Sequence, residues 1–193
     1  MYILIIGLAL FLGLHCFASI RSREPGNIAQ KYGIKYRAAF SLLSLIGFAL
    51  LVYGYGVARA DPNWNEPIWI APEWTRHLIL AIMPFSMILF AAAEAPAGYI
   101  KKYTKHPMVN GLKLWATVHL IYNGDWPSIA LFGGFLLMGS VSRTMSKLRK
   151  DEGARRQDVS IKGDVISVVI GLALYLAILF YLHEWLIGRP VLL

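Results

Sequence analysis

The chain has 193 residues, of which 57% are hydrophobic and 16% are charged. Soluble domains average about 45–50% apolar and about 25% charged residues, so this composition excludes a disordered chain and argues against a water-soluble one. The single cysteine, Cys16, excludes an internal disulfide, a thiolate zinc cage and an iron–sulfur cluster. A formal net charge of +8 fits either nucleic-acid binding or a membrane topology signal, and the positions of the basic residues decide between the two.

Six apolar stretches predict an all-α, polytopic membrane protein with a bundle of six transmembrane helices in a single domain. A helix needs about 20 apolar residues to cross a hydrocarbon core of about 30 Å, and the first, second and sixth stretches support this assignment without further argument. The other three are shorter, and their neighbours favour membrane spans over buried core helices. The predicted helices cover residues 1–20, 38–58, 77–95, 107–122, 126–142 and 165–187. We expect the first to be a permanent helix, because it lacks the basic start and the cleavage site of a signal peptide.

The distribution of Lys and Arg between the helices predicts the orientation of the chain. Five basic residues follow the first helix, three follow the third and seven follow the fifth, whereas the opposite side holds Arg59, Arg76 and Arg189. The positive-inside rule therefore places the three basic segments in the cytoplasm and both termini outside. We expect the basic segments to contact anionic lipid headgroups, and we expect no nucleic-acid partner.

The outer segment from Asp61 to Arg76 carries Trp64, Trp69 and Trp74 at a nearly regular spacing. Tryptophan is enriched where a membrane meets water. The spacing therefore favours an interfacial anchor over the alternative interpretation, the mouth of a substrate site.

Two histidines lie well inside predicted apolar helices, where an ionisable residue is costly unless it is paired or functional. His15 has no charged residue among the 14 that precede it, and His119 shares a helix face with Trp115 and other apolar residues. Each is either a hydrogen-bonded packing residue or a ligand. Histidine pairs on facing transmembrane helices can hold haem b, and the spacing leaves this as one option among several.

The other three histidines lie near predicted helix ends. His77 and His183 are near outer ends, where contact with lipid headgroups is the simpler interpretation. His106 precedes Pro107, a residue favoured at a helix start, and is either a cap or interface contact or a substrate or cofactor ligand. None of the histidines matches H-E-x-x-H or a zinc-finger spacing.

A long motif around the predicted fourth helix resembles the NnrU family of bacterial integral membrane proteins, which has plant 15-cis-zeta-carotene isomerase as a relative. The motif consists of residues 105–111 (Lys-His-Pro-Met-Val-Asn-Gly), 114–116 (Leu-Trp-Ala) and 119–125 (His-Leu-Ile-Tyr-Asn-Gly-Asp). Further matches are His15 with the arginines after it and residues 36–37, 54–56 and 131–133. Two positions depart from the family pattern, since Lys105 stands where arginine is usual and Asn110 where a large residue is common.

The resemblance implies a protein of the bacterial inner membrane that binds haem b through two histidines. Matching positions in the carotenoid isomerase relative imply that His15 and His119 are the axial ligands of the iron. Residues implied at the cofactor site besides these two are His106, Trp115, Asn123 and Asp125. Ser19 and Asn123, each one turn from a ligand, are expected to orient its ring.

The activity that the resemblance implies is linked either to nitrite and nitric-oxide metabolism or to haem-dependent double-bond isomerisation. Whether the chain is a cis–trans isomerase or a redox protein therefore stays open, and an apolar substrate is one expectation. The oligomeric state is open as well.

The expected depths of the two ligands differ. Counted from the cytoplasmic boundary at about 1.5 Å per residue, His15 lies about 9 Å deep and His119 about 18 Å deep. His106 is therefore an alternative partner for His15, and His77 and His183 are alternatives to His119.

Two other functions compete with haem binding. The His106-Pro107 helix start also resembles S-adenosylmethionine-dependent membrane methyltransferases of the isoprenylcysteine carboxyl methyltransferase type, with Asp151 and Glu152 as candidate acids. The tyrosine-rich continuation expected after those acids is missing. The third interpretation is a membrane assembly subunit without chemistry of its own. An absorption spectrum of the purified protein separates the haem hypothesis from the others.

Overall fold

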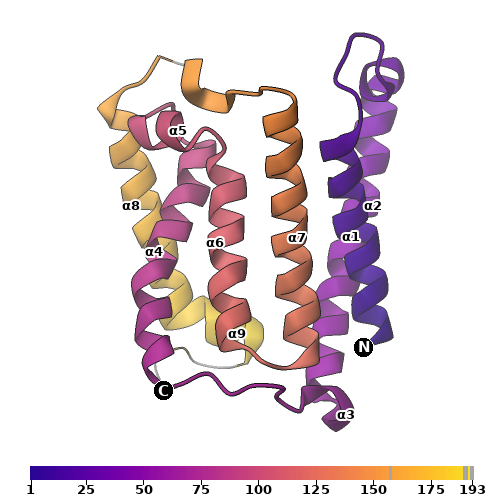
Figure 1. Ribbon diagram of the computed structural model, residues 1–193, viewed down its shortest axis with the longest axis vertical. Coiled ribbons are helices and arrows are strands. Elements are labelled where there is room, and N and C mark those ends of the chain that lie inside the picture. Colours follow the sequence, from indigo (N-terminus) through magenta and orange to yellow (C-terminus); the bar gives the residue numbers. More distant parts are fainter. Residues whose placement is uncertain (157, 189–190, 192–193) are drawn as a thin grey trace. The chain divides into compact units, whose positions relative to one another are not determined.

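The computed structural model describes residues 1–156, 158–188 and 191, and within them it is helical with no β-strand. The prediction of an all-α protein is therefore confirmed (Figure 1). The chain packs as two compact units, which are described separately below. Unit 1 contains residues 1–70 and 123–145, and unit 2 contains residues 71–122 and 146–193.

Within the described residues, five helical segments are long and apolar enough to cross a membrane, as expected of a multi-pass membrane protein. They are Tyr2–Ile20, Ile28–Ala60, Trp74–Glu94, Trp126–Leu148 and Ile161–Ile187. The predicted fourth span corresponds to α6 (Pro107–Tyr122), whose 16 residues fall short of that length. A sixth transmembrane helix thus stays a prediction.

Unit 1 is built on an antiparallel helix pair formed by α1 (Tyr2–Ile20) and α2 (Ile28–Ala60). Three glycines let the two backbones approach closely, because a Cβ on any of them would overlap the facing backbone. Gly7 lies against residues 50–51, Gly54 against residues 3–4, and Gly47 against Phe11. Small residues at helix contacts are the usual packing device in membranes, since lipid tails are as apolar as leucine.

Two helices of unit 1, α2 and α7, extend beyond their predicted spans. The helix α2 begins at Ile28 rather than at residue 38, because Asn27 caps it by accepting a 3.0 Å bond from the Ala29 amide. A kink at Gly33, where φ is 50°, divides its first turns from the apolar remainder. The helix α7 (Trp126–Leu148) runs past the predicted end at residue 142. Charged residues end the apolar span here without ending the helix, since Lys and Arg are good helix formers.

The short helix α3 (Pro62–Asn65) follows α2, and the chain after it is fixed to the start of α7. Ile68 donates a 2.8 Å backbone bond to the Gly124 carbonyl, and Pro67 and Asp125 form an isolated bridge. A side chain at Gly124 would overlap Trp69. Glycine is therefore required at this close approach of two loops.

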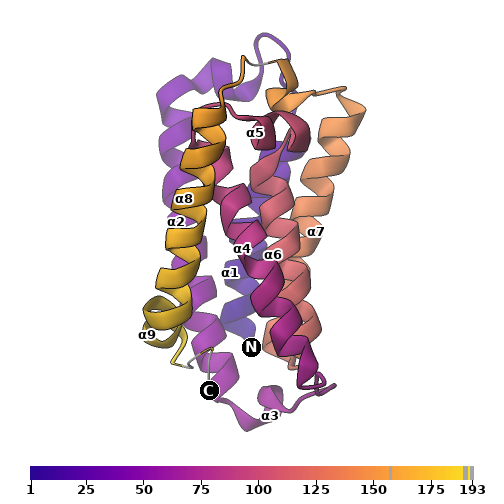
Figure 2. The same ribbon diagram turned by 90° about the vertical axis from the view of Figure 1, so that its left-hand side faces the viewer.

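In unit 2, α4 (Trp74–Glu94) lies between α6 and α8 (Ile161–Ala177), as Figure 1 and Figure 2 show. Gly111 of α6 packs on the backbone of Ser86, whose hydroxyl donates a 2.8 Å bond to the Gly111 carbonyl. Gly171 of α8 packs on the backbone of Ile88 on the other side of α4. Close glycine contacts on both sides thus hold α4 in place.

Pro84 lies inside α4 and leaves one carbonyl without its helical partner. Proline has no N–H, so the carbonyl of Leu80, four residues earlier, loses the bond that a helix interior normally supplies. The Tyr175 hydroxyl of α8 donates a 2.9 Å bond to that same carbonyl. A neighbouring helix therefore supplies the missing donor, which is how prolines are tolerated in membrane helices.

A short helix that the sequence did not predict, α5 (Tyr99–Thr104), connects α4 to α6. Its first amides are capped from α8, because the Asp164 carboxylate accepts bonds of 2.9 Å from the Tyr99 amide and 2.8 Å from the Ile100 amide. Gly98 and Gly163 leave room for this contact, since a Cβ on either would overlap the facing segment.

The predicted helix at residues 165–187 is divided in the structure. It begins earlier, at Ile161, where Ser160 accepts a 3.3 Å bond from the Lys162 amide. It then passes through a π-helical turn, η2 (Ile178–Leu182), into α9 (His183–Ile187), which ends at the left-handed Gly188. The helix α4 likewise starts at Trp74 rather than at residue 77.

Candidate functional site

The two histidines predicted to be axial ligands have the same local geometry. In unit 1, His15 on α1 has its Nδ1 atom 2.8 Å from the Phe11 carbonyl oxygen, one turn earlier. In unit 2, His119 on α6 has its Nδ1 atom 2.8 Å from the Trp115 carbonyl oxygen, also one turn earlier. Because a carbonyl oxygen only accepts, Nδ1 carries the proton in both rings and the lone pair of a neutral imidazole lies on Nε2.

An aromatic ring lies beside each of these imidazoles. The ring centroids of His15 and Phe11 are 4.3 Å apart, and Phe40 of α2 lies 5.3 Å from His15 on another side. The centroids of His119 and Trp115 are 5.1 Å apart. Trp115 itself packs on a buried cluster formed by Met83, Met87 and Val118. Both rings thus lie in apolar, aromatic surroundings.

The groups that hold Nδ1 of these two rings are backbone carbonyls. Ser19 was predicted to orient His15, but its hydroxyl lies 2.8 Å from the hydroxyl of Ser142 on α7. The carbonyl one turn earlier in the same helix holds Nδ1 of His15 instead, and the same is true of His119. A backbone carbonyl fixes the tautomer as well as a side chain does.

His106 lies at the start of α6 in unit 2 and contacts the segment that follows α7. Its Nε2 atom is 3.2 Å from the Asp151 carbonyl oxygen. The Lys105 carbonyl accepts a 3.2 Å bond from the Ala154 amide, and a side chain at Gly153 would overlap the Lys105 carbonyl. His106 thus joins two connecting segments, and its Nε2 is the protonated nitrogen in that arrangement.

Asp125 is buried in unit 1, with 6% of its surface exposed, and belongs to a network at the start of α7. Its carboxylate accepts a 2.9 Å bond from the Ser128 amide, which caps the helix, and lies 3.8 Å from Nη2 of Arg59. Arg59 also donates a 3.0 Å bond to the Tyr55 hydroxyl, which lies 3.0 Å from the Ser128 hydroxyl. We call these four residues, Tyr55, Arg59, Asp125 and Ser128, the Arg59 network.

Sequence reasoning missed three members of the Arg59 network. The pattern Asp125-x-x-Ser128 before an apolar run is a recognisable helix start, so the capping role of Asp125 had a signal. No sequence pattern indicates the pairing of Asp125 with Arg59, because the two residues are far apart in the sequence.

The structure divides the predicted site residues between the units. Unit 1 contains His15, Asn123 and Asp125, and unit 2 contains His106, Trp115 and His119. Within the described residues there is no group of three or more His, Cys, Asp or Glu side chains that could hold a metal ion. Two neutral imidazoles fit haem iron, because the porphyrin supplies the other four ligands.

The comparisons with known proteins give one family. Comparison with curated proteins gives no match, and comparison with solved structures gives none either. The family described as NnrU protein matches residues 3–191, which is nearly the whole chain. The chain therefore belongs to the NnrU family.

Proposed function

We propose that this NnrU family member binds haem b, with His15 and His119 as the axial ligands. One observation supports the proposal above the others: both rings donate from Nδ1 to the carbonyl one turn earlier, which leaves Nε2 as the ligating nitrogen. Such a bond fixes the orientation of the ring and raises the basicity of the ligating nitrogen. Haem iron with histidine ligands would supply electron transfer or, after loss of one ligand, binding of a small molecule.

The residues around the ligands contribute apolar surface. Phe11 and Phe40 beside His15, and Trp115 beside His119, offer flat faces that suit a porphyrin and exclude water. His106 is the weaker candidate, because ligation through Nε2 would break its bond to the Asp151 carbonyl.

The test is the haem content of single variants of the full chain, purified in detergent and expressed to equal level. We expect His15→Ala and His119→Ala each to lose most of the bound haem or to shift the Soret band, while the matched control His106→Ala keeps both. If His15→Ala and His119→Ala retain the haem content and spectrum of the wild type and His106→Ala does not, the ligand assignment is wrong.

We propose two activities that haem would support in this family, nitrite or nitric-oxide metabolism and isomerisation of a double bond in an apolar substrate. Carbon monoxide difference spectra of the reduced protein distinguish ligand or substrate chemistry at the iron from electron transfer. Rapid binding would mean that one histidine can be displaced, which ligand or substrate chemistry at the iron would require. No binding favours electron transfer.

A second candidate, the methyltransferase, is favoured by one contact. Nε2 of His106 lies 3.2 Å from the backbone carbonyl of Asp151, so the helix start and the segment that carries the candidate acids are brought together in unit 2. The absorption spectrum of the purified protein also tests this second candidate. A protein that stays colourless after haem supplementation and binds S-adenosylmethionine reverses the order of the two proposals, and one that binds neither supports an assembly role.

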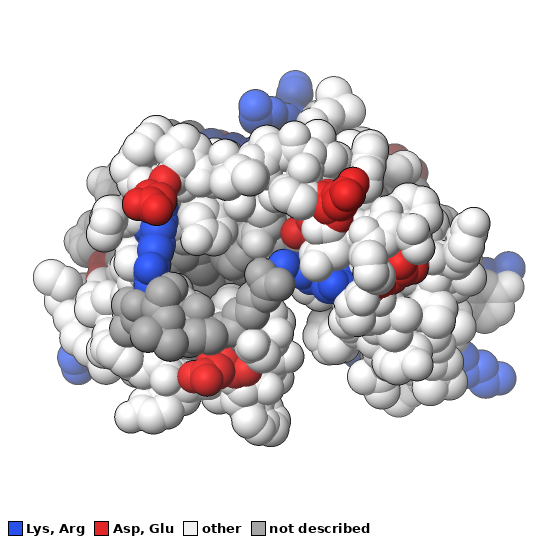
Figure 3. All heavy atoms as spheres, turned by 90° about the horizontal axis from the view of Figure 1, so that it is seen from below, with Lys and Arg blue, Asp and Glu red and all other residues white. Residues whose placement is uncertain are grey.

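We propose that the protein lies in the bacterial inner membrane with six spans and both termini outside, and with anionic headgroups on its basic segments. The helix α6 would be the sixth span, since its 16 residues extend about 24 Å at 1.5 Å per residue. Among the described residues that Figure 3 shows, the groups of acidic and basic side chains are separated by uncharged atoms. Reporter fusions after Pro25, Lys102 and Arg155 should all report cytoplasm, and two periplasmic results among the three would contradict the topology.

A further inference from the structure

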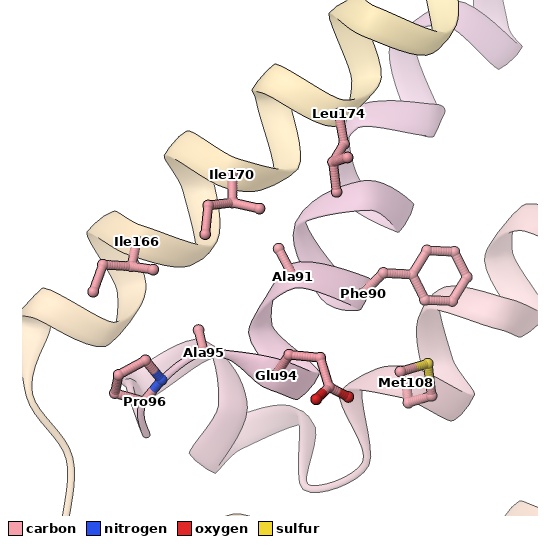
Figure 4. Close-up of a pocket in the computed structure, with 9 residues that line it drawn as sticks. All are labelled: Phe90, Ala91, Glu94, Ala95, Pro96, Met108, Ile166, Ile170 and Leu174. Carbon is pink, nitrogen blue, oxygen red and sulfur yellow. The ribbon is translucent and has the colours of Figure 1, made fainter. Parts of the chain in front are cut away.

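An apolar groove of about 650 Å³ lies on unit 2 between α4, α6 and α8 (Figure 4). One wall is formed by Ile166, Ile170 and Leu174, which are one turn apart on α8. Phe90 of α4 and Met108 of α6 contribute to the rest of the lining. The volume is in the range of about 300–1,000 Å³ that is typical of small-molecule sites.

The close helix contacts described above give this groove fixed walls. The Gly163, Ser167 and Gly171 face of α8 is buried, and Gly163 and Gly171 lie directly against the backbone of α4 and the segment after it. The neighbouring face of α8, which carries the groove wall, is left partly exposed, and Ile170 is 45% exposed. The groove is thus a consequence of glycine packing and does not depend on the rotamer of a single side chain.

A single carboxylate, Glu94 at the end of α4, belongs to the otherwise apolar lining. Glu94 is exposed and, within the part of the chain that the structure describes, forms no hydrogen bond and no ion pair, so its carboxylate is open to water and to a ligand. The side-chain ammonium of Lys101 bonds to the backbone, because it donates bonds of 2.9 Å to the Ala93 carbonyl and 3.0 Å to the Ala95 carbonyl. The polar group left for a ligand in the groove is therefore an acceptor with a negative charge.

We propose that this groove binds a long-chain alcohol, with the chain along the α8 wall and the hydroxyl donating to Glu94. The apolar walls fit a hydrocarbon chain, and a carboxylate acceptor selects a head group that donates a hydrogen bond. A fatty acid is disfavoured, because its own carboxylate would meet Glu94 at close range. The proposal is independent of haem binding, since it rests on residues of α4, α6 and α8 that play no part in the haem proposal.

The experiment is photolabelling of the full chain in lipid nanodiscs with a long-chain primary alcohol that carries a diazirine on its chain and a terminal alkyne. The matching carboxylic acid is the second probe. Mass spectrometry of the labelled peptides locates the probe, and we expect it on the α8 wall. We expect the wild type to be labelled by the alcohol about tenfold more than by the acid, as the loss of a charge-assisted hydrogen bond predicts.

Three variants separate the groove from ordinary contact with lipid. Ile170→Trp fills the groove and should remove labelling of the wall, whereas Leu172→Trp, at a similarly exposed position outside the lining, should leave it unchanged. Glu94→Gln should remove the preference for the alcohol over the acid while labelling by the alcohol persists. Equal labelling of the wild type by both probes, or equal effects of the two tryptophans, would overturn the proposal, since both results describe unspecific lipid contact.

Discussion

The polar contacts between helices at the end of a span in unit 1 differ from those inside the spans of unit 2. In unit 1 a partly buried ion pair between Arg59 and Asp125 lies where α2 ends and α7 begins. In unit 2, single hydroxyl groups of Ser86 and Tyr175 bond to backbone carbonyls within the apolar spans. The difference follows from the solvent, because a charge is costly deep in a bilayer while a hydroxyl that finds a carbonyl is not.

Close backbone packing in unit 1 should be the feature most sensitive to substitution. Gly54→Ala places a methyl group into the backbone of α1, and we expect a loss of about 3 kcal/mol or more of unfolding free energy, because overpacking against a backbone cannot be relieved by a rotamer change. The measurement is unfolding in mixed micelles, followed by circular dichroism. Gly56→Ala is the matched control on the same helix, where a Cβ meets no atom within 4 Å. Equal destabilisation by the two substitutions would contradict the packing argument, because helix propensity alone favours alanine over glycine at both positions.

Neutralising the ion pair of unit 1 should have the next largest effect. Asp125→Asn keeps the shape and one acceptor but leaves Arg59, whose side chain is 17% exposed, without its counter-charge. We expect a loss of about 2–3 kcal/mol, below the about 3–5 kcal/mol typical of fully buried pairs, because the pair is long and partly hydrated. The double variant Arg59→Met with Asp125→Asn should recover much of the loss. A double variant less stable than both single ones would contradict the proposed role of the unpaired charge.

Removing a single hydroxyl in unit 2 should have a smaller effect that depends on Pro84. Tyr175→Phe leaves the Leu80 carbonyl without a donor, and we expect a cost of about 1–2 kcal/mol. In a Pro84→Ala background the restored amide donates to the same carbonyl, so Tyr175→Phe should then cost almost nothing. A double-mutant cycle with thermal unfolding in detergent measures this coupling. The same cost in both backgrounds would mean that the hydroxyl does not replace the helical bond.

The membrane-spanning helices were predictable where the length of an apolar stretch is enough to assign them. A stretch such as residues 2–20 can be assigned from composition, because the bilayer imposes a minimum length on the span. The ends of helices were less accessible, and α2 shows why. Its first ten residues include the basic side chains Lys31, Lys35 and Arg37 and lie before the apolar part, so apolar length does not reveal that they are helical.

The candidate site was predictable to a different extent. The bond from Nδ1 of His15 or His119 to the carbonyl one turn earlier is local, so a histidine in a helix is enough to permit it. The position of His106 against Asp151, the Arg59 network and the groove beside Glu94 depend on contacts between segments that are distant in the chain. A single sequence carries no signal for such contacts.

The cap that Asp164 places on α5 has a consequence for the order in which the protein matures during synthesis. The six residues of α5 are too few to hold a helix without outside support, and the carboxylate that supports it lies 65 residues further along the chain. At about 5–20 residues per second the ribosome needs about 3–13 s to produce that distance. During these seconds α5 lacks its cap, and we expect this connection between α4 and α6 to fold only after the start of α8 has been synthesised.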